Sequence, residues 1–93
     1  PLPGISPDRK YRLFQLEGES MLPVPDGSWV LGEYVRDWTA VRERQACVVV
    51  TTSQPVFKLV ENRLGREGRL LLHSLNPTVR SYALPAEEVR ELW

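Results

Sequence analysis

The sequence predicts an all-β domain with little helix, built as a small barrel or as coiled sheets, and three observations support this class. Short strand-like segments follow one another along almost the whole chain. β-branched residues are concentrated in them, most clearly in Cys47–Thr52. Turn residues such as glycine, proline and asparagine separate the segments. Short strands joined by turns are typical of barrels and coiled sheets.

The predicted strands differ in how strong their signal is. Tyr11–Glu17 alternates, with Arg12, Phe14 and Leu16 on one side. Cys47–Thr52 has the strongest signal, because consecutive β-branched residues suit a pleated, buried surface, and it is predicted to be a central strand. The predicted strands are Tyr11–Glu17, Trp29–Val35, Cys47–Thr52, Val56–Leu64 and Arg69–Ser74. The third and fourth are expected to form a hairpin.

Turn chemistry predicts the first connections. Pro25–Ser28 is predicted as a turn in which Gly27 takes a positive φ. Gly32, inside the second strand, indicates a bulge or a close approach of another segment. Arg36–Gln45 is polar and is predicted as a loop with at most one helical turn.

The last third of the chain contains the weakest signals. Gly65–Gly68 is predicted as a turn, and Asn76-Pro77 ends the fifth strand. Pro85–Glu88 favours a short helix, because proline suits an early helical position and acidic residues suit the N-terminal end of the dipole. Val89–Trp93 either extends that helix or forms a last strand.

Length and composition limit the function classes. The 93 residues suit one domain, and twelve basic against twelve acidic residues give no excess positive charge for nucleic acid. The single cysteine, Cys47, cannot form an internal disulfide and is expected to be an inert buried thiol, and no zinc-binding spacing or cofactor motif is present. No apolar run is long enough to span a membrane, so a cytoplasmic protein is expected. Residues 1–10, rich in proline, are predicted to end an interdomain linker, and 11–93 to form the domain.

Ser20 and Lys58 form a candidate catalytic pair. Ser20 follows Gly18 at the end of the first predicted strand, at the start of a loop punctuated by prolines. Lys58 lies in the apolar run Val56–Val60, where burial favours the neutral amine that can accept a proton. A neutral Lys58 would activate the Ser20 hydroxyl, and backbone amides around Ser20 would hold an oxyanion. The reaction class that this pair indicates is acyl transfer.

Simpler interpretations of these residues stay open. A serine after glycine is often only a turn former, and a lysine in an apolar strand is often an edge residue whose head reaches solvent. A catalytic triad of His73, the only histidine, with Ser20 and either Asp26 or Asp37 is formally possible, but the spacing of these residues does not support it. Trp93 is expected to be covered by a partner subunit, because a free terminal tryptophan leaves a large apolar area in water.

Several of these segments together resemble a known family. Gly18-Glu19-Ser20-Met21-Leu22-Pro23, the turn Asp26-Gly27, Lys58 and Ser74-Leu75-Asn76-Pro77 resemble the C-terminal domain of LexA-type and phage-type repressors. That family contains self-cleaving Ser/Lys peptidases related in fold to bacterial signal peptidase, and the resemblance covers residues 11–93. It implies Ser20 as nucleophile and Lys58 as general base. The motif and oxyanion-site residues that it implies are Gly18, Glu19, Met21 and Pro23.

The resemblance also implies an architecture and partners. We expect coiled β-sheets with a small barrel-like core and a terminal strand at Val89–Trp93. The resemblance implies a homodimer formed through this domain and a helix-turn-helix domain, N-terminal to it, that alone binds operator DNA. Cleavage of the linker would then end DNA binding, with a RecA-type filament as a candidate activator. No metal, cofactor or membrane partner is implied.

Two departures from the family keep other functions open. Leu75 stands where the family often has aspartate, and the chain contains neither of the usual cleavage pairs, Ala-Gly or Cys-Gly. The scissile bond is therefore expected upstream of Pro1, or to be absent. The alternative is a non-catalytic dimerisation and sensing module of such a regulator. A signal-peptidase-like enzyme acting on other proteins is a third reading, disfavoured because no membrane anchor is found.

Overall fold

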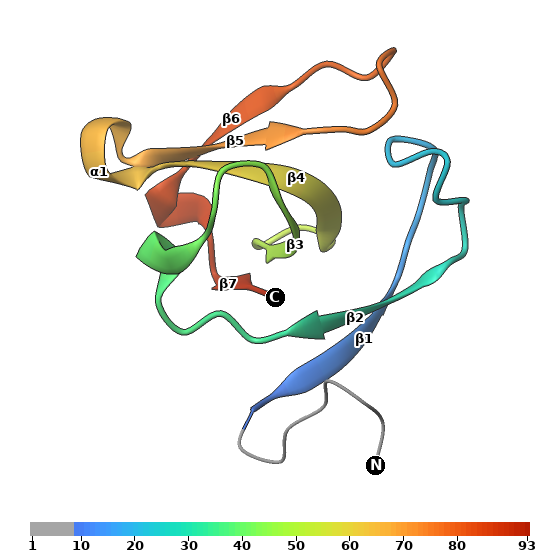
Figure 1. Cartoon of the computed structure of the whole chain (residues 1–93), viewed down its shortest axis with the longest axis horizontal. Coiled ribbons are helices and arrows are strands. Elements are labelled where there is room, and N and C mark those ends of the chain that lie inside the picture. The colour runs from blue at the N-terminus through green and yellow to red at the C-terminus, as the bar shows by residue number, and fades with distance from the viewer. Residues whose placement is uncertain (1–8) are drawn as a thin grey trace.

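The chain folds mainly into antiparallel strands that form two sheets (Figure 1). The computed structural model describes residues 9–93, so the predicted linker lies almost entirely outside the described residues. The smaller sheet pairs β1 (Tyr11–Gln15) with β2 (Trp29–Glu33). The larger sheet has the order β6-β5-β4-β3-β7. Its strands are β3 (Gln45–Val50), β4 (Val56–Arg63), β5 (Arg69–His73), β6 (Tyr82–Pro85) and β7 (Glu91–Leu92).

The all-β class is confirmed, and the two sheets do not close into a barrel within the described range. In the part of the chain that the structure describes, helix is limited to three single turns: η1 (Trp38–Ala40), α1 (Leu64–Glu67) and η2 (Ala86–Glu88). The turn predicted at Gly65–Gly68 is therefore helical, and it ends at Gly68, which has a φ of +65°. No helix between residues 9 and 93 is long and apolar enough to cross a membrane.

The core lies on one face of the larger sheet. Alternate residues of β3, β4 and β5 point into it, and loop residues and β7 complete it. Its buried members are Val41, Cys47, Val49, Val60, Leu70, Leu72, Val89 and Leu92. The strand at Cys47–Thr52 is confirmed as interior, but β4 rather than β3 is the middle strand, because only the two-residue β7 lies beyond β3.

The smaller sheet packs on the opposite face of the larger one, beside the C-terminal tryptophan (Figure 1). The Trp93 ring packs edge-on against Phe14, with centroids 5.7 Å apart, and against Tyr34 at 5.1 Å. A Cβ added to Gly32 would lie 2.7 Å from Trp93 Cβ, so the predicted close approach is confirmed. Trp93 is thus partly covered by its own chain and keeps an intermediate exposure, and the partner subunit expected over it stays a prediction.

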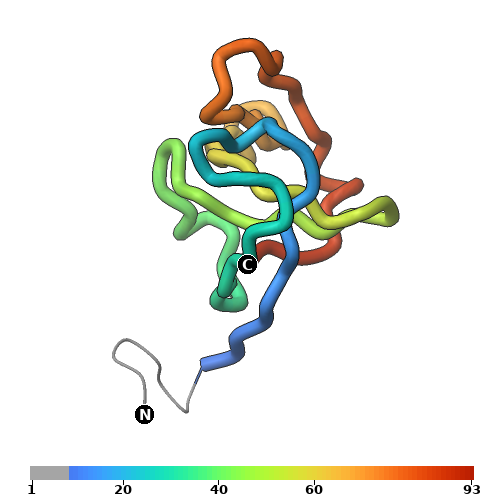
Figure 2. The backbone as a smooth tube through the Cα atoms, turned by 90° about the vertical axis from the view of Figure 1, so that its right-hand side faces the viewer, coloured from blue at the N-terminus to red at the C-terminus, as the bar shows by residue number. Residues whose placement is uncertain are grey.

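The β1–β2 connection is a long loop that lies beside the β5–β6 loop (Figure 2). The ladder continues past β1, because Leu16 N donates to Ser28 O at 2.7 Å. Gly27 adopts the predicted positive φ, at +84°. The last strand implied for Val89–Trp93 is confirmed as β7.

Candidate functional site

Ser20 lies in the first of two overlapping turns of the β1–β2 loop. Gly18 has a φ of +85°, which other residues rarely adopt, and its amide donates to Asp26 Oδ1 at 2.7 Å. Leu22 N donates to Glu19 O and Val24 N donates to Met21 O. Met21 is fully buried and anchors the loop in the protein interior. Ser20 is therefore presented by a loop that is fixed on both sides.

Asn76 ties this loop to the larger sheet. Its backbone amide donates to Ser20 O at 2.9 Å, and its side-chain Nδ2 donates to Glu19 O at 3.0 Å. The other side-chain atom, Oδ1, accepts from Thr78 N at 3.0 Å and from Thr78 Oγ1 at 2.8 Å, which fixes the orientation of the amide. The β5–β6 loop thus holds the two carbonyls on either side of the Ser20 amide.

Lys58 is buried in the middle strand of the larger sheet. Only 6% of its surface is exposed, and its neighbours on the same face of β4 are Val56 and Val60. The edge-strand interpretation of this lysine is wrong, because β4 has a partner strand on each side. The register that pairs Leu59 with His73 places Ser74 opposite Lys58, just past the end of β5. Lys58 Nζ donates to Ser74 Oγ at 2.8 Å.

Burial lowers the pKa of the Lys58 amine below its usual range. The ring of Tyr82 opposes this shift, since an aromatic face favours the charged amine. Its centroid is 5.8 Å from Nζ, near the limit of such contacts, so desolvation dominates. Lys58 therefore becomes a neutral base at a lower pH than an exposed lysine.

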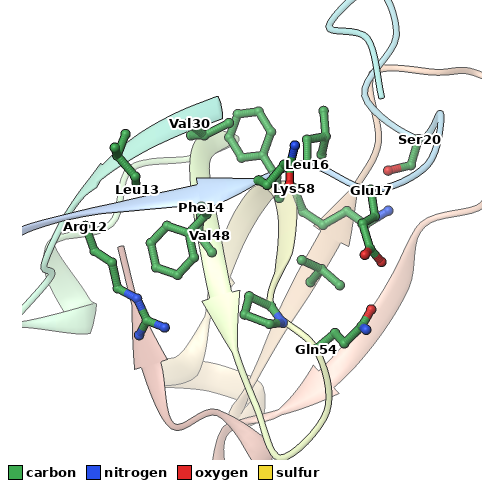
Figure 3. A pocket seen from close by; sticks show the side chains of 14 residues that line it. Arg12, Leu13, Phe14, Leu16, Glu17, Ser20, Val30, Val48, Gln54 and Lys58 are labelled. Atoms are coloured by element: carbon green, nitrogen blue, oxygen red, sulfur yellow. The ribbon is translucent and has the colours of Figure 1, made fainter. Parts of the chain in front are cut away.

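Ser20 and Lys58 line the same pocket, which has a volume of about 450 Å³ (Figure 3). Its apolar walls include Phe14 and Leu16 from the β1 segment and Val48 and Phe57 from β3 and β4. Ser20 Oγ makes no hydrogen bond to any residue in the range 9–93, and in particular none to Lys58. The structure thus brings the predicted pair into one pocket without a direct bond between them.

Free backbone donors lie next to the Ser20 hydroxyl. Within the described part of the chain, the amides of Ser20 and Met21 donate no hydrogen bond. Glu19 contributes its carbonyl, and its exposed side chain is not part of the pocket lining. Pro23 is exposed and also lies outside the lining. Of the predicted oxyanion and motif residues in the described range, Glu19 and Met21 have amides that donate no hydrogen bond, and the Met21 amide directly follows Ser20.

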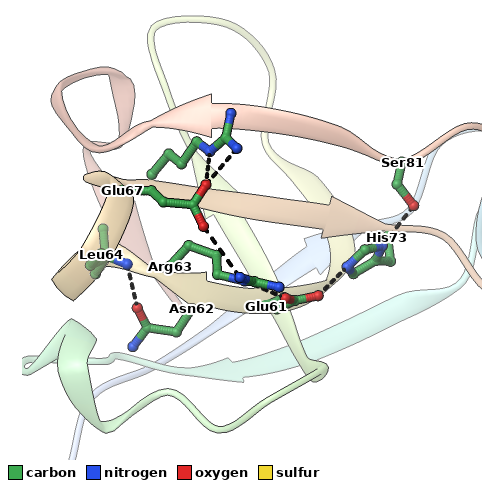
Figure 4. A network of polar contacts seen from close by, with 8 residues as sticks. Glu61, Asn62, Arg63, Leu64, Glu67, His73 and Ser81 are labelled. Carbon is green, nitrogen blue, oxygen red and sulfur yellow. Dashed lines mark hydrogen bonds and ion pairs between the residues drawn. The ribbon is translucent and has the colours of Figure 1, made fainter.

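The histidine alternative is not formed. His73 Nδ1 is 2.6 Å from Ser81 Oγ, and Nε2 is 2.9 Å from Glu61 Oε1 (Figure 4). Neither predicted aspartate approaches this histidine: Asp26 accepts from Gly18, and Asp37 caps η1 by accepting from Thr39. His73 belongs to a network on β4 and β5 that includes the Arg63–Glu61 ion pair.

The remaining reactive group is the Cys47 thiol. It is 1% exposed, and burial raises its pKa to about 11. It is protonated at neutral pH, as an inert buried thiol should be. No cluster of three or more metal-ligating side chains occurs among residues 9–93.

Sequence reasoning missed the contacts of Ser74 and Asn76. Both were identified only as part of a resembling motif, and neither was given a role. The β4–β5 hairpin contained a usable signal, since its register alone places Ser74 opposite Lys58. The Asn76 contacts join segments 57 residues apart, and no local pattern predicts such a pair.

The chain matches no protein-family model, and no curated protein is significantly similar to it.

Proposed function

We propose that this chain is the self-processing and dimerisation domain of a LexA-like or phage-type transcriptional repressor, acting as a Ser/Lys peptidase on its own interdomain linker. One observation carries the proposal: a buried lysine whose pKa is lowered lines the same pocket as an unbonded serine hydroxyl. Such an amine loses its proton at a lower pH than an exposed one, which suits it to act as a base. The coiled-sheet, signal-peptidase-like arrangement, the homodimer and a cytoplasmic location belong to the same proposal.

The proposed reaction uses the two side chains in sequence. Neutral Lys58 takes the Ser20 proton as Oγ bonds to the scissile carbonyl carbon, and the amides of Ser20 and Met21 stabilise the oxyanion. The C–N bond then breaks, and the Lys58 ammonium returns its proton to the leaving amine. Water hydrolyses the acyl-enzyme with Lys58 again as base, which restores Ser20.

The hydrogen bond to Ser74 supports this assignment. Since a neutral amine has two N–H groups and one lone pair, Lys58 can donate to Ser74 and still accept from Ser20. The bond fixes the position of the amine, which lines the same pocket as the free Ser20 hydroxyl.

The open edge of β1 suits an extended peptide. Within residues 9–93, β1 pairs only with β2, and the bonds Leu16 N to Ser28 O and Tyr34 N to Lys10 O show which positions face β2. Leu13 and Gln15 alternate with those positions, so their backbone groups point to the open edge beside the pocket. A linker segment added there as a strand would pass the Ser20 hydroxyl.

Cleavage would separate this domain from the DNA-binding domain proposed to precede it. A dimeric repressor gains affinity because binding of one half-site raises the effective concentration at the second. Cutting the linker removes that advantage.

The test is incubation of the full-length regulator, linker included, from pH 7 to about 10, near the ordinary lysine pKa. We expect two fragments that form faster as pH rises, because a larger fraction of Lys58 is neutral. Ser20→Ala and Lys58→Ala should each abolish them. A chain that stays intact under all conditions would contradict the peptidase assignment.

A second candidate is a non-catalytic dimerisation and sensing module of such a regulator. It is favoured by the absence of Ala-Gly and Cys-Gly from this chain and by the lack of a Ser20–Lys58 hydrogen bond. An uncut but dimeric protein, measured by sedimentation equilibrium, would support it.

A further inference from the structure

Two exposed charges of opposite sign stand at the two ends of the Ser20–Lys58 pocket. Its charged lining residues are Arg12, Glu17 and Lys58. Lys58 is buried and bonded to Ser74, whereas Arg12 and Glu17 are exposed. Neither of these two side chains makes a hydrogen bond or ion pair with another residue between 9 and 93. Both charges are therefore available to a ligand.

The two charges are separated along the direction of β1. Arg12 lies in β1, and Glu17 follows the strand after its last residue, Gln15. Five extended positions span about 17 Å. Figure 3 shows Glu17 near Ser20 and Arg12 at the opposite end. A strand lying along this edge would meet a carboxylate near the nucleophile and a guanidinium at its far end.

The space between the charges is apolar. Phe14 and Leu16 are buried below the β1 edge, and Val48 and Phe57 line the facing wall. The Arg12 guanidinium stacks over the Phe14 ring, 4.9 Å from its centroid, which holds the charge at the rim of this floor. Apolar side chains at alternate positions of an extended peptide would contact the floor.

We propose that the pocket selects an extended peptide segment with a basic residue beside the bond to be cut and an acidic residue about five positions away, with apolar residues between them. This inference rests on the proposed function, because it assumes that the pocket binds peptide. Beyond that function, it specifies the chemical class of peptide segment that the pocket binds. The basic residue meets Glu17, and the acidic residue meets Arg12.

Four fluorescein-labelled hexapeptides test the inference. They are Lys-Val-Ala-Val-Ala-Glu, the same sequence in reverse order, and versions with lysine at both ends or glutamate at both ends. Binding to the full chain carrying Ser20→Ala is measured by fluorescence anisotropy at low salt, so that the result does not depend on cleavage. At least one mixed peptide should bind about two- to fivefold more tightly than both like-charged peptides, as expected for partly exposed ion pairs.

Charge reversal of each end makes the test specific. Glu17→Lys should shift the preference to the peptide with two glutamates, and Arg12→Glu to the peptide with two lysines. Glu43→Lys is the matched control, because Glu43 is exposed, lies outside this pocket and changes the net charge equally. In about 1 M salt the preferences should disappear, because the Debye length falls to about 3 Å.

Equal binding of all four peptides, or preferences that do not reverse in the two variants, would overturn the inference. Its failure is distinguishable from failure of the proposed function. If the linker stays uncut but the peptide preferences reverse in the two charge variants, only the proposed peptidase activity is contradicted. A cut linker with no charge preference would contradict only the selection of the segment.

Discussion

Burial of Lys58 disfavours the charged form of its amine. The folded chain lowers the pKa of this amine, so the unfolded chain binds more protons between the folded value and the ordinary lysine pKa. Stability therefore rises with pH across that window. Below it, the fold bears the full cost of holding a buried ammonium, offset in part by the bond to Ser74.

Lys58→Met tests this balance, because methionine keeps much of the side-chain volume without the charge. We expect the variant to be more stable than the wild type at pH 7, by about 1 kcal/mol, and the advantage to shrink toward pH 10. Urea unfolding at both pH values measures the two differences. An advantage of the same size at both would mean that charge burial is not its source.

Asn76 acts on Ser20 through the loop rather than through the reacting atoms. Asn76→Ala removes the bond to Glu19 O but leaves the backbone bond to Ser20 O. We expect a stability loss of about 1 kcal/mol and self-cleavage slowed by roughly ten- to a hundredfold. The pH dependence of cleavage should keep its midpoint, since Lys58 is untouched. A shifted midpoint would show that Asn76 acts on the base instead.

At the scale of elements, the contact between β2 and the C-terminal segment controls how the two sheets dock. Gly32→Ala would place a Cβ 2.7 Å from Trp93 Cβ and 3.4 Å from Phe14 Cε2. We expect a loss of about 1–3 kcal/mol, because the tight neighbours must move. Chemical denaturation with tryptophan fluorescence measures it.

The control is Gly65→Ala in α1, where an added Cβ meets nothing within 4 Å. Alanine favours a helix over glycine by up to about 1 kcal/mol, so this variant should be neutral or slightly more stable. Equal losses in both variants would contradict the role given to the sheet–sheet contact.

Local chemistry predicted β1 to β5, but neither β6 nor the order of the strands in the sheet. The predicted bounds of these five strands differ from the observed ones by up to two residues, most clearly at β3, which begins at Gln45 rather than Cys47. Only pairing between distant segments shows that β4, not β3, is central. The partial cover that Phe14 and Tyr34 give Trp93 depends on the same long-range packing, and the partner subunit expected over it stays a prediction.

For the whole molecule, the candidate site exists only where the two sheets meet. Ser20 comes from the loop of the smaller sheet, and Lys58 from the middle of the larger one. The sequence identified both residue types and their surroundings, since a lysine among apolar residues and a serine after glycine are visible locally. The pocket and the partner Ser74 depend on register and docking, which are properties of the folded chain.

The link between Asn76 and the Ser20 loop also sets an order of events in time. Because the bonded segments are 57 residues apart, closing this contact carries the entropy cost of a long loop, and it is favourable only after the strands between them have paired. During translation, Ser20 is synthesised first, Lys58 later and Asn76 last. The Ser20 loop is therefore tied to the larger sheet only after most of the domain has been synthesised.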